Sequence, residues 1–168
     1  MNAEDLRKLQ TPLKEKYRDQ PQSAMITLKA EGKIGEGISC QIETRKAMIE
    51  AGLHPATGGN GMLACSGDLL LEALVACAGV TLGAVSTAIG VDIRNGVVKA
   101  EGDLDFRGTL GVSKEVSVGF QSIRLSFVLD TNATEEQMES LSKLTERYCV
   151  VYQTLVKGVP VNTNFERQ

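Results

Sequence analysis

The residues of this chain with the greatest scope for chemistry are four cysteines, Cys40, Cys65, Cys77 and Cys149. No two of them have the C-x-x-C spacing of a redox dithiol or a zinc site, and a single histidine, His54, leaves few other metal ligands. We therefore expect no bound metal. The first residues lack the apolar run of a secretory signal, so we expect a cytoplasmic protein without a structural disulfide framework. Packing and thiol redox chemistry remain as interpretations of the cysteines.

Segment 66–90, which is uncharged past Glu72, predicts one helix with Cys77 in its middle. Ser66 is a suitable N-cap, Asp68 places negative charge in the first turn, and Gly90 suits the residue after the helix. One face carries bulky residues at spacings of three and four: Leu71, Val75, Ala78, Leu82, Val85 and Ile89. Another face carries the small residues Ala76, Gly79, Gly83, Ser86 and Gly90. A helix this apolar is expected to be buried, with a second backbone close to its small-residue face.

A cysteine in such a helix also has an ordinary structural explanation, because free cysteine packs as a small hydrophobe. The uncharged run approaches the length of a membrane span. Against a span, the run is rich in Ala and Gly, Asp68 and Glu72 lie in its first turns, and no basic cluster flanks it. We therefore expect no membrane insertion, and the residues alone leave packing and redox chemistry open for Cys77.

The composition predicts one globular domain with an aliphatic core. The 168 residues include no Trp and 4% aromatic residues, and the net charge is −3 without a basic block. Nucleic acid and anionic membrane surfaces are therefore not expected as partners. Leu6, Leu9 and Leu13 have helical spacing and predict an N-terminal helical extension over 1–20, which leaves 21–168 as a single domain.

Alternating apolar and polar residues predict strands on both sides of the central helix. Before it we expect a strand, a glycine-rich turn, a strand with Cys40 as a packing residue, and a strand or helical turn, at 24–31, 32–37, 38–44 and 45–52. After it, Asn95-Gly96 predicts a hairpin, and strands are expected at 97–106, 120–129 and, as an edge strand, 159–165. This order predicts the α+β class, with helices on one face of antiparallel sheets.

A second long helix is predicted from Thr134 to Lys157. Thr134 and Gln137 form a capping-box pattern, and Gly158 follows the helix as a stop signal. The apolar stripe of this helix comprises Met138, Leu141, Thr145, Tyr148, Tyr152 and Leu155, with Cys149 at its edge.

Two segments of the chain resemble the OsmC/Ohr family of bacterial hydroperoxide reductases, within a similarity that covers roughly residues 24–165. Segment 67–77, GDLLLEALVAC, is similar to the family's acidic-L-L-x-A-A-L-x-A-C block. Segment 146–155, ERYCVVYQTL, is similar to the region of the family's second cysteine, which a turn and a final strand follow. Pro55 and Gly58-Gly59 resemble the Pro and Gly-Gly that precede the first cysteine helix of the family.

This resemblance implies an intertwined homodimer with the central helices at its core and active sites at the interface. It also implies a thiol peroxidase that reduces organic hydroperoxides in an antioxidant stress response. Cys77 would be the peroxidatic thiol, which becomes a sulfenic acid, and Cys149 the resolving thiol, which forms a disulfide with it. No cofactor is implied, and a thiol reductant, such as a lipoyl dithiol, would reopen the disulfide.

In the family, an arginine held by an acidic residue near the start of the central helix activates the first cysteine. The acidic residue maps to Asp68, although Ohr-type members have Glu one position earlier, where this chain has Gly67. Arg45 is the sole arginine between residues 19 and 93 and is the candidate for the activating arginine. An exposed charge at a strand end is the alternative interpretation of Arg45.

Other departures from the family pattern keep two alternatives open. Val150 stands where many members have Pro, and the stretch 54–65 is longer than in Ohr-type members and carries its own cysteine. One alternative is a non-catalytic dimer that binds a small apolar ligand at the interface pocket. In the other, Cys65 replaces Cys149 as the resolving thiol. The roughly 18 Å of helix between Cys65 and Cys77 excludes this pairing within one rigid chain but not across a dimer.

Overall fold

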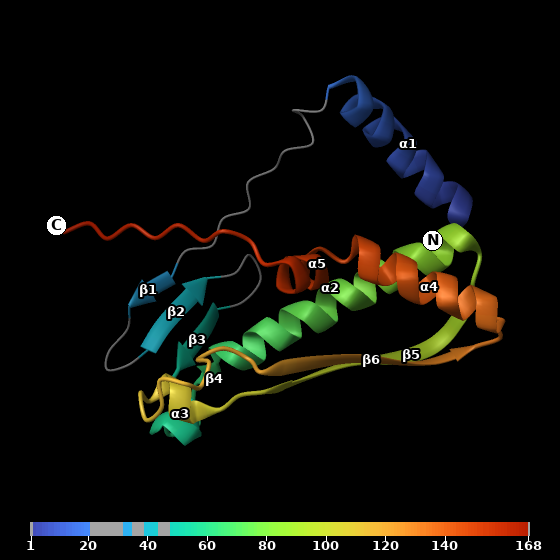
Figure 1. The fold of residues 1–168 in the computed structure, drawn as a ribbon. Coiled ribbons are helices and arrows are strands. Elements are labelled where there is room, and N and C mark those ends of the chain that lie inside the picture. The colour runs from blue at the N-terminus through green and yellow to red at the C-terminus, as the bar shows by residue number, and fades with distance from the viewer. Residues whose placement is uncertain (1, 21–31, 35–38, 44–47, 168) are drawn as a thin grey trace.

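The chain is built around one long helix, α2 (Ser66–Ile89), with a small sheet at its N-terminal end (Figure 1). A ribbon of two long strands, β5 and β6, lies along one side of α2, and helices α4 and α5 lie along another. The computed structural model describes residues 2–20, 32–34, 39–43 and 48–167. The mixed architecture confirms the predicted α+β class.

Helix α2 has the bounds that its sequence predicts, except at its N-cap. The short strand β4 (Ala64–Cys65) keeps the backbone extended as far as Cys65, because Cys65 pairs with Gly52. Cys65 is therefore the N-cap, without a side-chain capping bond, and Ser66 is already helical. Gly90 ends the helix in the left-handed conformation (φ 74°), and its N–H donates to the carbonyl of Ser86.

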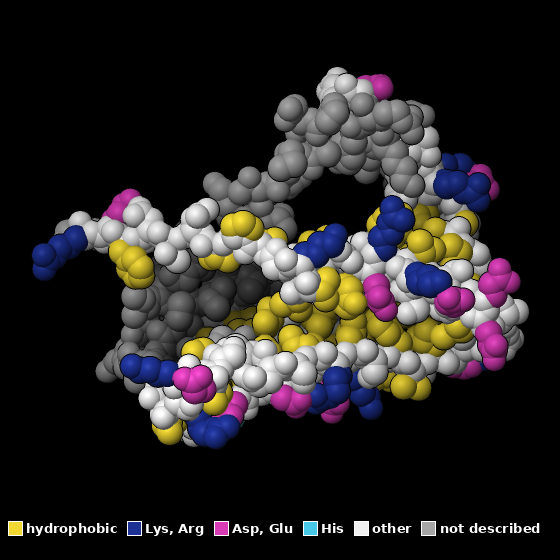
Figure 2. Space-filling view, viewed as in Figure 1, with side chains coloured by type: hydrophobic (Ala, Val, Ile, Leu, Met, Phe, Trp, Pro, Cys, Tyr) yellow, Lys and Arg dark blue, Asp and Glu magenta, His cyan; other side chains and the backbone are white. Residues whose placement is uncertain are grey.

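Only one face of α2 is buried within the single chain. Leu74, Ala78, Leu82, Val85 and Ser86 are covered, largely by α4, α5 and β5. Val80 is 76% exposed, so the described part of one chain does not bury α2 on all sides. Figure 2 shows apolar side chains exposed between the β5–β6 ribbon and helices α4 and α5. By length and composition α2 is also apolar enough to cross a membrane, but core helices of soluble proteins pass the same test, so this support is weak.

The small sheet has the order β1-β2-β3-β4. Strands β1 (Gly32–Ile34), β2 (Ser39–Glu43) and β3 (Met48–Gly52) are antiparallel neighbours, and β4 joins β3 in parallel. The strand expected at 38–44 is confirmed, and 45–52 is a strand in its described part. The residues from Gly32 were expected in a turn but pair with β2, and the strand expected at 24–31 lies outside the described residues.

The hairpin predicted at Asn95-Gly96 is wrong. Both residues lie inside β5 (Ile93–Asp103), which pairs antiparallel with β6 (Ser122–Thr131) along its whole length. A register irregularity separates Ile93 and Asn95, and Gly96 lies opposite Leu129. A Cβ on Gly96 would approach Leu129 Cδ2 to 2.8 Å, so a larger residue here would have to displace the end of the Leu129 side chain.

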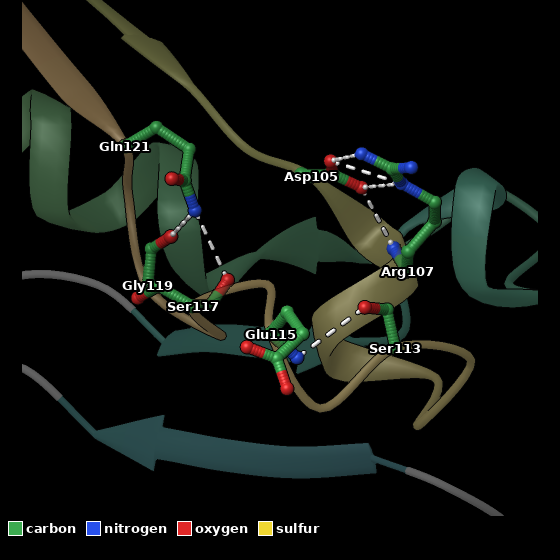
Figure 3. Close-up of polar contacts among 7 residues, drawn as sticks. All are labelled: Asp105, Arg107, Ser113, Glu115, Ser117, Gly119 and Gln121. Carbon is green, nitrogen blue, oxygen red and sulfur yellow. Dashed lines mark hydrogen bonds and ion pairs between the residues drawn. The ribbon is translucent and has the colours of Figure 1, made fainter.

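The connection from β5 to β6 is held by local polar contacts (Figure 3). The Asp105 carboxylate caps the short helix α3 (Phe106–Thr109) by accepting from the Arg107 backbone N–H and forms an ion pair with the Arg107 guanidinium. The Gln121 amide donates to the carbonyls of Ser117 and Gly119. These contacts all join residues of the connection itself.

The predicted second helix is two helices, α4 (Glu135–Tyr148) and α5 (Val150–Lys157), separated by Cys149. The capping box of Thr134 and Gln137 is confirmed, with both reciprocal bonds present. No strand forms at 159–165: the chain there is exposed, with Phe165 94% accessible, and no described strand lies beside it to pair with. The N-terminal helix is confirmed as α1 (Ala3–Asp19), which continues through Pro12.

Candidate functional site

Cys77 and Cys149 meet where the middle of α2 faces the junction of α4 and α5. Cys77 packs against a buried cluster of Leu74, Ala78 and Cys149. Cys149 is 1% exposed, whereas the sequence placed it at the edge of an apolar stripe. Each thiol is also among the groups that shift the pKa of the other. The structure therefore brings together the two cysteines that sequence reasoning had singled out.

The conformation of Cys149 creates this junction. Its backbone is extended (φ −73°, ψ 109°), so it ends α4 and also begins α5. Its N–H donates to the carbonyl of Thr145 at 3.0 Å, and its carbonyl accepts from the N–H of Gln153 at 2.9 Å. With the backbone bonds of both helices ending on this residue, the buried thiol has a fixed position opposite α2.

The Cys77 thiol has several hydrogen-bonding neighbours. Burial by itself raises the pKa of Cys77, but hydrogen bonds from the Val151 N–H, the Cys149 thiol and the Val150 N–H act in the opposite direction. The Thr81 hydroxyl also lowers this pKa and donates to the Cys77 carbonyl at 2.8 Å. The net effect is a Cys77 pKa below the ordinary thiol value, which favours the nucleophilic thiolate.

Cys149 has the opposite tendency. Burial is the main cause that raises its pKa, and the neighbouring Cys77 sulfur raises it further, against a lowering contact from the Tyr152 N–H. The two thiols therefore differ in direction, with the pKa lowered at Cys77 and raised at Cys149. This arrangement suits a thiolate that attacks a substrate and forms a sulfenic acid. The neighbouring thiol can then condense with that product.

A groove of about 690 Å³ lies beside the cysteine pair, between β6 and the helices α4 and α5. Its lining includes Leu74, Tyr152 and Leu155, which also cover Cys149. The hollow band of apolar side chains in Figure 2 lies over these elements. Polar groups are also present, among them Arg124 and Glu146. Neither cysteine is among its lining residues, so the groove adjoins the cysteine cluster through Leu74, Tyr152 and Leu155.

Asp68 lies at the other end of α2. It lines a cavity of about 370 Å³ together with His54, Cys65, Asp103 and Phe106. At the helical rise, Asp68 is about 13 Å along α2 from Cys77, so this chain alone does not bring the Asp68 carboxylate to the thiol pair. Cys65 is farther still from Cys77, which leaves its proposed resolving role dependent on a second chain.

Arg45 lies outside the described residues, so its predicted contact with Cys77 stays a prediction. Within the described ranges, no arginine is among the groups that shift the Cys77 pKa. The same ranges contain no cluster of three or more His, Cys, Asp or Glu residues that could hold a metal ion. Sequence reasoning missed Thr81 and the N–H groups of Val150 and Val151. The available indication in the sequence was Val150 itself. Many family members have proline at this position, and valine, unlike proline, has a backbone N–H that can donate.

The OsmC-like protein family model matches residues 59–164. By sequence, no curated protein matches the chain. Among solved structures, an OsmC like protein from Mycoplasma pneumoniae has a TM-score of 0.66 at 16% identity, covering 80% of this chain and 89% of its own. The organic hydroperoxide resistance protein OsmC from Legionella pneumophila has a TM-score of 0.62 at 15% identity, covering 80% and 93%.

The organic hydroperoxide resistance protein OhrB of Bacillus subtilis has a TM-score of 0.52 at 19% identity, covering 80% of this chain and 93% of its own. At these identities the structures show a shared fold. The family match extends over more than half of the chain and includes both Cys77 and Cys149. The chain belongs to the OsmC-like protein family.

Proposed function

We propose that the chain is a thiol-dependent peroxidase that reduces organic hydroperoxides, with Cys77 as the attacking thiol and Cys149 as the resolving thiol. One observation carries this proposal: Cys77 packs against the cluster that contains the buried Cys149, next to a partly apolar groove, with the pKa of Cys77 lowered and that of Cys149 raised. The names of the Legionella and Bacillus relatives, organic hydroperoxide resistance proteins, support the same activity class.

The proposed hydroperoxide reduction has three steps. The Cys77 thiolate attacks the terminal peroxide oxygen, the O–O bond breaks, and the substrate leaves as an alkoxide that takes a proton to become the alcohol. Cys77 is then a sulfenic acid, which condenses with the Cys149 thiol to a disulfide and releases water. An external dithiol, such as a lipoyl group, reduces this disulfide and restores both thiols while becoming a disulfide itself.

The groove supports an apolar substrate. Phe127, Leu125 and Ile123 of β6 line it opposite Leu155 of α5, so an alkyl or aryl group can lie there while its peroxide end faces the cysteines. The chemistry uses only side chains and an external thiol, so the proposal includes no cofactor. The proposed setting is an antioxidant response in the cytoplasm.

The active form is proposed to be a homodimer. Val80 of α2 is strongly exposed, as are the cross-strand neighbours Val97 and Val128 of the β5–β6 ribbon. Apolar surface on several elements around one helix is the type of surface that a second copy covers. Light scattering at micromolar concentration is expected to give twice the mass of the chain, and a stable folded monomer would contradict the dimer.

The activity is tested by following loss of cumene or tert-butyl hydroperoxide, with hydrogen peroxide for comparison and dihydrolipoamide or a monothiol as reductant. We expect catalytic consumption of the organic peroxides and a Cys77–Cys149 disulfide in the oxidised protein. The groove also fits a second candidate, a non-catalytic dimer that binds a small apolar ligand. Free thiols after stoichiometric hydroperoxide, together with saturable ligand binding, would favour that candidate.

A further inference from the structure

Thr145 is a threonine of α4 whose side chain is buried but whose hydroxyl makes no hydrogen bond within the described part of the chain. The residue is 2% exposed. Thr87 and Thr154, in α2 and α5, instead donate to the carbonyl four residues earlier, at 2.8 and 2.9 Å. A buried hydroxyl without a partner is costly, because it has lost its hydrogen bonds to water. The Thr145 hydroxyl therefore needs an explanation in the chemistry of its surroundings.

Thr145 lies on the face of α4 that packs against α2. Leu141 is one helical turn before it and Cys149 one turn after it, and each of these two residues is 1% exposed. Leu141 belongs to the same core cluster as Leu82 of α2, and Cys149 to the same cluster as Ala78 of α2. The hydroxyl of Thr145 thus lies between two apolar contacts, one turn from the proposed resolving thiol.

The backbone directs the Cys149 side chain toward Thr145. The Cys149 N–H donates to the Thr145 carbonyl at 3.0 Å, and the Cys149 φ of −73° is helical. Its Cα–Cβ bond therefore tilts toward the preceding turn, as in a continuous helix. On one helix face, Cβ atoms four residues apart are separated by about 5–6 Å. A change of the Thr145 rotamer can then bring its hydroxyl to the Cys149 sulfur.

We propose that the Thr145 hydroxyl donates a hydrogen bond to the Cys149 sulfur when that sulfur becomes a thiolate and attacks Cys77. A neutral thiol is a weak acceptor, which agrees with the absence of this bond from the described part of the reduced chain, whereas a thiolate is a strong one. The role in peroxide reduction rests on the proposed function, but the donor role applies to any leaving group on Cys77.

In the resolving step, the S–S bond forms as the S–O bond of the Cys77 sulfenic acid breaks. The proton of the Cys149 thiol leaves with the departing hydroxide as water. Thr145 keeps its own proton and stabilises the charge that develops on the Cys149 sulfur.

Thr145→Val separates this role from a purely structural one. Valine replaces the hydroxyl by a methyl group of similar size, so it removes the donor and keeps the packing volume. Because no described group bonds the hydroxyl in the reduced protein, the substitution is expected to raise the Tm by about 2–4 °C. Thr145→Ser keeps the donor. Thr154→Val is the matched control, since it removes an exposed hydroxyl that is bonded within α5.

The attack by Cys149 is measured without peroxide, in the full chain with Cys40→Ser and Cys65→Ser. Dithionitrobenzoate forms a mixed disulfide first at Cys77, because Cys149 is buried, and releases one nitrothiobenzoate. Cys149 then attacks the Cys77 sulfur and releases the second. Thr145→Val is expected to slow the second release about three- to tenfold, since a hydrogen bond raises the thiolate fraction more than it lowers the nucleophilicity. Thr145→Ser and Thr154→Val are expected to match the parent.

An unchanged second release in Thr145→Val would overturn the proposal and assign Thr145 to packing. A lowered Tm would also overturn it, because the hydroxyl would then have a partner in the reduced protein, such as an internal water.

A second measurement serves if the substituted background fails to fold. In the chain with all its cysteines, one equivalent of hydroperoxide and dimedone should leave more labelled Cys77 in Thr145→Val than in the parent, and equal labelling would overturn the proposal. A chain that consumes no hydroperoxide but shows the dependence of the second release on Thr145 would refute the proposed function and leave this inference intact.

Discussion

Cys65 and Cys77 are two free thiols of helix α2. Their position on the helix and their tertiary environment differ in which thiol they favour as the nucleophile. Cys65 caps the N-terminus of α2, the end at which a helix dipole favours an anion. Cys77 lies in the centre of α2, where that dipole has little effect. By its own helix alone, Cys65 should be the better nucleophile.

The surroundings of the two thiols differ. The cavity at Cys65 is lined by the carboxylates of Asp68 and Asp103, and Asp103 is kept ionised because its hydrogen bonds with Arg124 hold its pKa far below the usual range. Cys77 instead faces the N-terminal turn of α5 and the Cys149 thiol. The comparison teaches that an element packed from elsewhere in the chain, rather than the helix that carries the thiol, decides which cysteine is activated.

The largest effect separates the two thiols of α2. Cys77→Ser is expected to lower peroxide consumption on the order of 10³-fold or more, because a serine hydroxyl is neither ionised nor sufficiently nucleophilic at neutral pH. Cys65→Ser is expected to retain the parent rate. A dye assay of residual organic hydroperoxide measures both variants. Full activity in Cys77→Ser, or loss of activity in Cys65→Ser, would contradict the assignment of Cys77, rather than Cys65, as the attacking thiol.

Replacing Cys149 should stop turnover while sparing the first chemical step. Cys149→Ser leaves the Cys77 sulfenic acid without a resolving partner, so one equivalent of hydroperoxide is consumed and the product reacts with dimedone. Excess oxidant should convert Cys77 to the sulfinic form. Mass spectrometry of the peptides distinguishes these products. A disulfide between Cys77 and Cys65 in this variant would show instead that Cys65 resolves across the dimer.

Arg45→Ala is expected to slow peroxide reduction about tenfold with the fold intact, since an adjacent guanidinium stabilises a thiolate and can hydrogen-bond the peroxide. Arg94→Ala is the control, because Arg94 is an exposed partner of Asp130 on the β5–β6 ribbon. Stopped-flow second-order rate constants measure the effect. An unchanged rate would show that the difference in reactivity between Cys77 and Cys65 does not depend on an arginine from the segment before α2.

The smallest expected effect concerns the Thr81 hydroxyl, which acts on the Cys77 pKa. Thr81→Val removes one contact that lowers the Cys77 pKa, so its rate profile should shift to higher pH, with about two- to fivefold less rate at pH 7 and the parent rate once the thiol is fully ionised. Thr87→Val is the control: Thr87 makes the same type of bond, to the Gly83 carbonyl at 2.8 Å, away from the thiols. A rate lost equally at every pH would assign Thr81 a structural role.

The sequence by itself determined the elements whose signals are local. Gly90 ends α2 and Thr134 with Gln137 caps α4, because left-handed glycine and a capping box depend on a few neighbouring residues. The two cysteines of the site were also identifiable, through the family pattern around them. Strand alternation located β2 and most of β6 for the same reason, because a period-two pattern of apolar and polar residues is read along a single segment.

Tertiary structure decided the features that depend on distant partners. Asn95-Gly96 has the composition of a turn, but pairing with Asp130 and Leu129 of β6 holds it inside a strand. Neither glycine nor proline marks the break at Cys149, and only packing of α5 against the α2 cluster turns the chain there. The N–H groups of Val150 and Val151, which follow this break, are among the groups that lower the Cys77 pKa. The activation of the thiol is therefore a property of two helices brought together, because electrostatic stabilisation depends on distance in space and not on distance along the chain.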